Sequence, residues 1–539
     1  MKKTICFFAL LSSVLVFGQG SPVPKWIRTA DNRDGTYTNP VINSDYSDPD
    51  AIRVGNRFYM TASSFNCIPG LPILESEDLV NWKLISYALN RLEPEEVYNF
   101  PQHGKGVWAP CIRFHKNTFY IYYPDPDFGI YRIESKNPEG PWSAPILVKS
   151  GKGLIDPSPL WDDDGKAYLV YAFAGSRAGI KNMLVVCSMN PEGTIAQNDE
   201  VLIIDGHADE PTIEGPKIYK RNKYYYIFAP AGGVATGWQT VLRSKNIFGP
   251  YEKKKVLDQG KTAINGPHQG AWVQTKNGED WFLHFQDKGV YGRVVHLQPM
   301  KWSNDWPVMG MDEDNNGIGE PVITYKKPNA GKSFSISSPP DSDEFNVPKL
   351  GLQWQWHANP QRSWGFPTAM GYFMLNCIPK PKDAVNLFDI PNLLLQKLPD
   401  DTFLATAKLQ FDAHSDGDEA GLVVMGNDYT YLKLKRENGK IYLSQVTCID
   451  AIKKEAEKES DKMLLKNSDI FLQVKMMENG IAAFSYSEDG QNFKPVGKAF
   501  TVKEGRWIGA KIGFVALRDK FTNDAGNIKI DYIRFNKLP

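Results

Sequence analysis

Residues 48–61 read DPDAIRVGNRFYMT, and four later segments of the chain repeat the same pattern. They are WAPCIRFHKNTFYIYY from Trp108, DPSPLWDDDGKAYLVY from Asp156, EGPKIYKRNKYYYIFA from Glu214 and HQGAWVQTKNGEDWFLHF from His268. In each, an apolar residue stands four positions after the first residue, and a polar turn then leads into an aromatic-rich strand. The first residues are separated by 60, 48, 58 and 54 residues. A period of roughly 55 residues with two strands per unit is typical of a β-propeller, so five repeats predict five blades.

The shared register of the repeats predicts a cluster of polar side chains. The innermost strands of a propeller run along its central channel, so equivalent positions at their starts converge at one end. Here these positions hold Asp48, Trp108, Asp156, Glu214 and His268. Three neighbouring carboxylates resist simultaneous ionisation, so at least one pKa should rise. A protonated carboxylic acid beside an ionised carboxylate is the pair that glycoside hydrolysis requires, and Glu214 has the longer reach of a proton donor.

Charge and composition exclude several other functions. The 62 basic and 62 acidic residues cancel, which gives a pI near 7.1 and no electrostatic case for binding nucleic acid or an anionic membrane. Aromatic residues make up 12% of the chain, enough to fill β-rich cores or to stack on sugars.

The N-terminus reads as an export signal, with Lys2 and Lys3 before an apolar run over 5–17. We therefore predict a signal peptide over residues 1–18, export to the periplasm or the medium, and no membrane anchor, because the run is too short to span a bilayer. Five widely spaced cysteines remain in the mature chain. They argue against a disulfide framework, although one bridge stays open, and against a zinc site.

At these motifs the sequence resembles glycoside hydrolase family 43, the five-bladed propeller enzymes that include β-xylosidases and α-L-arabinofuranosidases. The matching stretches are NPVINSDYSDPDAIRVGNRFYM, CIPGLPILESEDLVNW, GKGVWAP, LIDPSPLWDDDGKAYLVY, IEGPKIYKRNKYYYIF and GRVVHLQPMKW. The resemblance implies an inverting hydrolase in which Asp48 is the general base, Glu214 the general acid, and Asp156 the residue that orients the acid and tunes its pKa. No cofactor is required.

The same resemblance offers further substrate-binding candidates, each with a plain structural alternative. Trp108 either forms an aromatic wall against the bound sugar or packs in the core. Arg293 in GRVVHLQP either contacts sugar hydroxyls or lies on the surface. Gly70 and Leu71, next to Pro69, match a pocket loop or a simple turn. His268 is expected to hold the acid in place. In some family members a bound cation mediates this contact, so a structural calcium in the channel is one alternative. A histidine that only packs in the core is the second alternative.

The DEDNNGIGEP stretch from Asp312 begins like a calcium loop but lacks the acidic residue at position twelve, where Ile323 stands. We interpret it as a solvated loop.

The chain divides into a propeller over 30–325, a Pro- and Ser-rich linker over 326–341, and a second domain over 342–539. Alternating segments such as YTYLKLKREN and IAAFSYSEDG predict a β-sandwich there. It resembles the concanavalin-like domain of the xylosidase branch, which packs on the propeller and restricts the pocket to chain ends. The alternative is an independent carbohydrate-binding module with Trp354, Trp356 and Trp364 as sugar platforms.

The predicted activity is therefore release of terminal pentose from xylo- or arabino-oligosaccharides, with β-xylosidase ahead of α-L-arabinofuranosidase. No residue separates these two sugars, whose scissile carbons are alike. A sugar-binding propeller without hydrolysis is the remaining alternative, and it predicts a degraded triad that the sequence does not show. The oligomeric state is left open.

Overall fold

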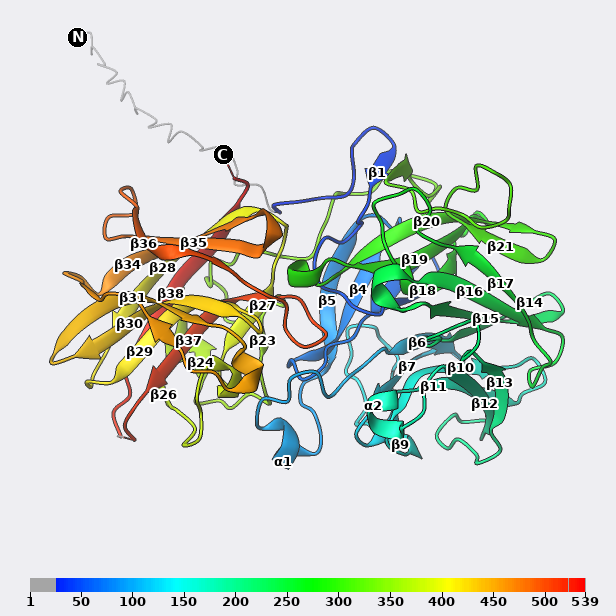
Figure 1. The fold of residues 1–539 in the computed structure, drawn as a ribbon, viewed down its shortest axis with the longest axis horizontal. Coiled ribbons are helices and arrows are strands. Elements are labelled where there is room, and N and C mark those ends of the chain that lie inside the picture. The colour runs from blue at the N-terminus through cyan, green and yellow to red at the C-terminus, as the bar shows by residue number, and fades with distance from the viewer. Residues whose placement is uncertain (1–25, 522, 539) are drawn as a thin grey trace, which may run out of the picture.

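The computed structural model describes residues 26–521 and 523–538, and these residues are almost entirely β-structure. Two bodies lie side by side in Figure 1, a propeller in blue to green and a sandwich in yellow to red. The predicted signal peptide, residues 1–18, lies outside the described residues. Within the described part of the chain, no helix is long and apolar enough to cross a membrane.

The propeller has five four-stranded antiparallel sheets, which confirms the five blades predicted from the repeats. In chain order the blades are β2 (Asp50–Val54), β3 (Arg57–Thr61), β4 (Gly70–Ser76) and β5 (Trp82–Leu89); β6 (Cys111–His115), β7 (Thr118–Asp125), β8 (Gly129–Ser135) and β9 (Ile146–Ser150); β10 (Leu154–Trp161), β11 (Ala167–Phe173), β12 (Met183–Met189) and β13 (Val201–Asp205); β14 (Lys217–Arg221), β15 (Tyr224–Ala231), β16 (Trp238–Ser244) and β17 (Glu252–Leu257); β18 (His268–Gln274), β19 (Asp280–Asp287), β20 (Arg293–Ser303) and β21 (Trp306–Met309). Short helices α1 (Glu95–Tyr98), α2 (Gly175–Ala178), α3 (Gly233–Thr236) and η1 (Gly289–Tyr291) lie in the connections.

The repeats also explain how neighbouring blades are joined. The apolar residue at the fifth position of a repeat donates its backbone N–H to a side chain of the preceding blade. Ile112 donates to Asp50 (2.8 Å), Ile218 to Ser158 (3.0 Å) and Trp272 to the Tyr219 hydroxyl (3.1 Å). Each bond satisfies a buried donor that the blade's own sheet leaves free, so it fixes the rotation of one blade against the next.

The ends of the propeller chain are brought together beside the ring. Strand β1 (Thr36–Thr38) pairs with β22 (Thr324–Lys326). The ring itself closes where Arg53 of the first blade donates through Nε to the Gln274 carbonyl of the last (2.6 Å). The stretch beginning at Asp312 is a largely exposed loop whose Asp312 carboxylate accepts the Asn316 and Gly317 N–H groups (3.1 and 2.9 Å), consistent with a solvated loop.

The second domain is a sandwich of two antiparallel-dominated sheets, as the alternating sequence segments predict. In the described residues one sheet has nine strands and the other seven. The first contains β23 (Gln355–Trp356), β26 (Ile378–Pro379), β27 (Leu394–Lys397), β29 (Asp418–Met425), β30 (Tyr429–Glu437), β31 (Lys440–Cys448), β32 (Lys458–Glu459), β33 (Met463–Leu464) and β37 (Lys511–Arg518). The second contains β24 (Gly365–Pro367), β25 (Phe373–Asn376), β28 (Phe403–Asp412), β34 (Asp469–Met477), β35 (Ile481–Ser487), β36 (Lys494–Thr501) and β38 (Asn527–Asn536), and η2 (Leu387–Asp389), η3 (Ala451–Lys453) and η4 (Glu478–Gly480) connect strands.

The sandwich packs directly on the propeller, so it is not an independently placed module. Trp354, Trp356 and Trp364 are 1%, 7% and 2% exposed, which rules them out as sugar platforms. Trp356 instead forms a two-way backbone bridge to Ile68 of the propeller (3.0 and 2.6 Å). The alternative role of these tryptophans is therefore wrong, because both faces of each ring are covered by protein.

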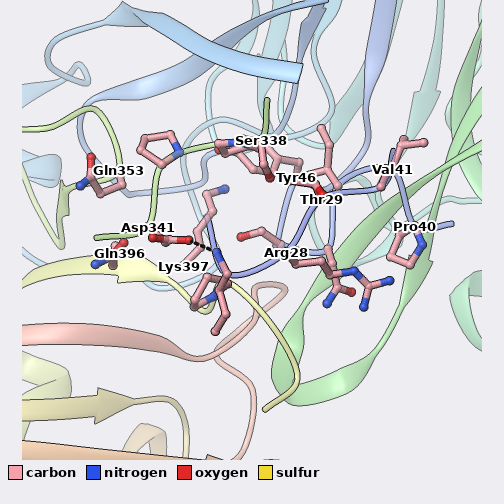
Figure 2. Close-up of a pocket in the computed structure, with 18 of the residues that line it drawn as sticks. Arg28, Thr29, Pro40, Val41, Tyr46, Ser338, Asp341, Gln353, Gln396 and Lys397 are labelled. Atoms are coloured by element: carbon pink, nitrogen blue, oxygen red, sulfur yellow. Dashed lines mark hydrogen bonds between the residues drawn. The ribbon is translucent and has the colours of Figure 1, made fainter. Parts of the chain in front are cut away.

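A narrow seam between the domains is shown in Figure 2. Lys397 and Gln396 of the sandwich face Tyr46 of the propeller and Asp341 of the linker, and Asp341 accepts the Ile27 N–H (2.8 Å). The space left has a volume of about 30 Å³, close to that of one water molecule. Burial lowers the pKa of Lys397 to about 8, although its ammonium lies 4.1 Å from the centre of the Tyr46 ring. The domains are thus closely packed.

All five cysteines in the described residues are buried free thiols. The one disulfide that the sequence left open is therefore not formed in this structure.

Candidate active site

A cavity of about 590 Å³ opens at one end of the propeller channel, and it contains all five residues that begin the repeats. Asp48, Trp108, Asp156, Glu214 and His268 come from five different blades. Their convergence follows from the shared register, because each lies at or just before the innermost strand of its blade.

Asp48 is buried and held by hydrogen-bond donors. Its Oδ2 accepts from the hydroxyls of Ser47 (2.7 Å) and Ser63 (2.5 Å), and its Oδ1 lies 3.5 Å from Nη1 of Arg293. These donors stabilise a carboxylate rather than a carboxylic acid. Asp48 also has a φ of 54°, in the left-handed region that a non-glycine residue occupies only when its surroundings hold it there.

Asp156 is the most deeply buried of the three carboxyl groups. It is 2% exposed, has a φ of 57°, and its Oδ2 accepts the N–H of Gly215 (2.7 Å), the residue after Glu214. Burial, followed by the neighbouring Glu214 carboxylate, raises the pKa of Asp156 to about 8. The pKa rise that the sequence predicts for at least one of the three carboxyl groups is therefore seen at Asp156.

Glu214 differs in being open to the cavity. Its side chain is 33% exposed, and its Oε1 lies 2.9 Å from Nε2 of His268. His268 is 1% exposed and thereby holds the carboxyl group in one orientation toward the cavity. Glu214 is thus positioned by two contacts, one through its side chain to His268 and one through the Gly215 N–H to Asp156.

The calcium in the channel, offered by the sequence as an alternative role for His268, stays a prediction. His268 Nδ1 is buried and makes no hydrogen bond to the described residues, so one donor atom is free. However, no three His, Cys, Asp or Glu side chains in the described part of the chain are arranged to hold a metal ion. A hard divalent cation prefers six to eight oxygen ligands, so backbone, amide and water oxygens would have to supply most of such a site.

Arg293 and Trp108 line the cavity as predicted. The Arg293 backbone N–H donates to Asp45 (2.9 Å), and its guanidinium donates to the Ser47 hydroxyl (2.9 Å). Trp108 is partly exposed, and its indole N–H donates to the Gly104 carbonyl (3.0 Å). Both are therefore fixed by the chain before any ligand arrives.

Gly70 and Leu71 do not line the cavity, contrary to the prediction. Leu71 is fully buried in the core of the first blades, and its N–H donates to Ser64 (3.1 Å). These residues support the loop that carries Phe65, and Phe65 itself lines the cavity. Gly70 and Leu71 therefore lie next to the pocket loop and do not form it.

The sequence did not point to several other lining residues, among them Lys181 and Asn182 after α2 and Trp507 of the sandwich. Trp507 has a φ of 64°, is 41% exposed, and its ring lies edge-on to Trp108 with 6.4 Å between centroids. An aromatic residue in the turn GRWIG is the only sequence signal for it. The second domain thus contributes a wall of the cavity.

Comparison with known proteins agrees with this geometry. Residues 37–307 match the model of glycosyl hydrolases family 43. The chain belongs to glycoside hydrolase family 43. Residues 342–536 match the β-xylosidase C-terminal concanavalin A-like domain, and the chain is a glycosidase.

The relatives within family 43 include enzymes for two pentoses. A protein of Xylanibacter ruminicola is 40% identical over 488 residues, which are 90% of this chain and 86% of that one. A β-xylosidase of Formosa agariphila is 33% identical and covers 94% of this chain and 91% of its own. A non-reducing end α-L-arabinofuranosidase of Bacteroides ovatus is 31% identical, over 79% and 81% of the two chains. The crystal structure of a family 43 protein from Bacillus licheniformis superposes with a TM-score of 0.81 at 26% identity, covering 93% of this chain and all of that one.

Proposed function

We propose that this protein is an exported, inverting exo-glycosidase that releases terminal β-D-xylose from xylo-oligosaccharides. The observation that carries the proposal is the placement of three carboxyl groups from three blades in one cavity, each with different partners. Export rests on the signal-like N-terminus, and inversion on the resemblance to family 43.

In this mechanism Glu214 is the general acid. It faces the cavity, and it competes with buried Asp156 for a proton. Two carboxyl groups that repel each other hold one proton more tightly than either would alone, so the pair retains one proton near neutral pH. Glu214 gives this proton to the glycosidic oxygen as the bond to the anomeric carbon breaks.

Asp48 is the general base in the same step. Its negative charge is stabilised by two hydroxyl groups and by Arg293. It takes a proton from a water molecule that attacks the opposite face of the anomeric carbon, and the oxygen of that water becomes the new anomeric hydroxyl with inverted configuration. Inversion requires the two catalytic carboxyl groups to be about 6.5–9.5 Å apart, which leaves room for this water.

Restriction to chain ends is supported by the wall that the sandwich adds. Trp507 and Trp108 meet at the cavity beside Arg293, and Arg177 lies over the Trp108 ring (5.0 Å). A substrate that extended past both ends of the pocket would have to cross these side chains. We therefore propose that one sugar enters the cavity and that the remainder of the oligosaccharide leaves on the Glu214 side.

An α-L-arabinofuranosidase is the second candidate, since relatives with both activities share this architecture. Initial rates on 4-nitrophenyl β-D-xylopyranoside and α-L-arabinofuranoside under identical conditions decide between them. We expect the xyloside to be faster, and proton NMR of the first product to show α-xylose. A faster rate on the arabinofuranoside would instead indicate an enzyme that removes arabinose side chains. Retained configuration in the product would refute the acid–base scheme. The Asp48→Asn variant, which lacks the general base, serves as the control with strongly reduced turnover on both substrates.

A further inference from the structure

A second, smaller cavity lies at the junction of the two domains beside the catalytic cavity. Its volume is about 210 Å³, roughly a third of the 590 Å³ of the catalytic cavity. We call it the side cavity; the residues around it include Asp287 and Arg293 of the propeller and Asn427, Glu504, Arg506 and Trp507 of the sandwich.

Arg293 and Trp507 line both cavities and so form the wall between them. The Arg293 guanidinium makes contacts in both cavities. Its Nη1 contacts Ser47 (2.9 Å) and Asp48 (3.5 Å) in the catalytic cavity, whereas its Nε lies 3.5 Å from Asp287 Oδ2 in the side cavity. A sugar hydroxyl that binds Arg293 in the catalytic cavity therefore lies next to the side cavity.

The lining of the side cavity has the chemistry that binds a neutral sugar. Asp287 and Glu504 supply acceptors for hydroxyl groups, and Arg506, whose guanidinium lies 4.5 Å over the Trp507 ring, supplies donors. The two carboxylates and the two guanidinium groups of Arg293 and Arg506 balance in charge. The cavity therefore offers no net attraction for an ion.

Asn427 lines the side cavity from the sandwich. Its backbone N–H donates to the Glu504 carbonyl (3.0 Å), and its Oδ1 is buried within the protein rather than open to the cavity. A larger side chain at this position would therefore enter the side cavity.

We propose that the side cavity binds a neutral pentosyl branch carried by the terminal sugar of the substrate. This rests on the proposed function and extends it, since it makes the enzyme one that accepts branched chain ends. The branch is placed on the terminal sugar because the side cavity adjoins Asp48 and Arg293. The residues after α2 and those around Thr212, on the Glu214 side where the leaving group departs, do not line it.

The test compares xylobiose with xylobiose that carries one α-L-arabinofuranosyl group on its non-reducing sugar. The Asn427→Trp variant fills the side cavity, Glu504→Ala removes one acceptor without filling it, and Asn467→Trp makes the same exchange in an exposed loop elsewhere in the sandwich. We expect wild type and the Asn467→Trp control to cleave both compounds with kcat/KM values within about tenfold. Asn427→Trp should lose tenfold or more on the branched compound alone, and Glu504→Ala roughly threefold to tenfold, the value of one or two hydrogen bonds.

Binding to Glu214→Gln, measured by calorimetry, separates this proposal from the proposed function. Adding Asn427→Trp to it should weaken the branched compound about tenfold and leave xylobiose unchanged. Failure of wild type to bind or cleave xylobiose would refute the β-xylosidase assignment itself. If xylobiose is cleaved but the branched compound is rejected by wild type, or if Asn427→Trp and Glu504→Ala affect both compounds equally, the side cavity does not bind a branch.

Discussion

Replacing Asp156 with asparagine removes one of the two coupled carboxyl groups from the catalytic cavity and keeps its shape. Asparagine retains an oxygen that can accept the Gly215 N–H, which Asp156 accepts at 2.7 Å, so the loop that carries Glu214 should stay in place. What changes is the electrostatic environment of the acid. Burial and, after it, the neighbouring Glu214 carboxylate raise the pKa of Asp156 to about 8.

The size of the effect follows from this coupling. Without Asp156 the proton is no longer shared by two coupled carboxyl groups, so the basic limb of kcat/KM should move to lower pH. We expect kcat/KM at pH 7 to fall about tenfold, the effect of a limb that moves by one pH unit, while at pH 5 the loss should be small.

The assay is the pH profile of kcat/KM on xylobiose and on 4-nitrophenyl β-D-xylopyranoside. Nitrophenolate is a weak base and leaves with little help from an acid, so its rate should fall much less than that of xylobiose. Asp164→Asn, at an exposed position in the same blade, is the matched control and should change neither profile. An unchanged basic limb, or an equal loss at every pH and on both substrates, would refute the coupling between Asp156 and Glu214.

Three further outcomes are expected. Asp48→Asn should lower kcat on both substrates by about 10²–10⁴-fold at every pH, because a better leaving group does not compensate for a missing general base. Steady-state kinetics measure this loss, and a loss confined to xylobiose would contradict the role of Asp48. Trp507→Ala should raise KM for xylobiose about twofold to tenfold, the value of one aromatic contact, with a smaller change in kcat, and an unchanged KM would remove Trp507 from the binding site. His103 lies at the domain junction, its ring stacked on Phe388, and burial lowers its pKa to about 4. Because the folded state binds the proton less tightly than the unfolded state, stability should fall as the pH drops from about 6.5 toward 4, and His103→Phe should flatten this dependence in urea titrations.

The repeats explain why so much of the propeller could be predicted. Each begins with a residue at the mouth of the channel and places an apolar residue four positions on, so one local pattern sets the strand, its face and its register. The cluster of Asp48, Asp156 and Glu214 follows from the same register without any knowledge of long-range contacts. The second domain was predictable in class, because alternation along a strand is also a local property.

Other features depend on contacts between distant parts of the chain. Trp507 is more than four hundred residues from Asp48 in sequence, and it reaches the cavity only because the sandwich packs on the propeller through Trp356 and Ile68. The same packing buries the tryptophans that the sequence offered as sugar platforms.

The sequence by itself determined the blades, the two domains and the three carboxyl groups, because a periodic pattern carries its own register. The tertiary structure alone decided that Asp156 is buried with a raised pKa, which loop residue reaches the cavity, and that a side cavity exists. These depend on burial and on the docking of two surfaces, and neither is encoded in the spacing of residues along one strand.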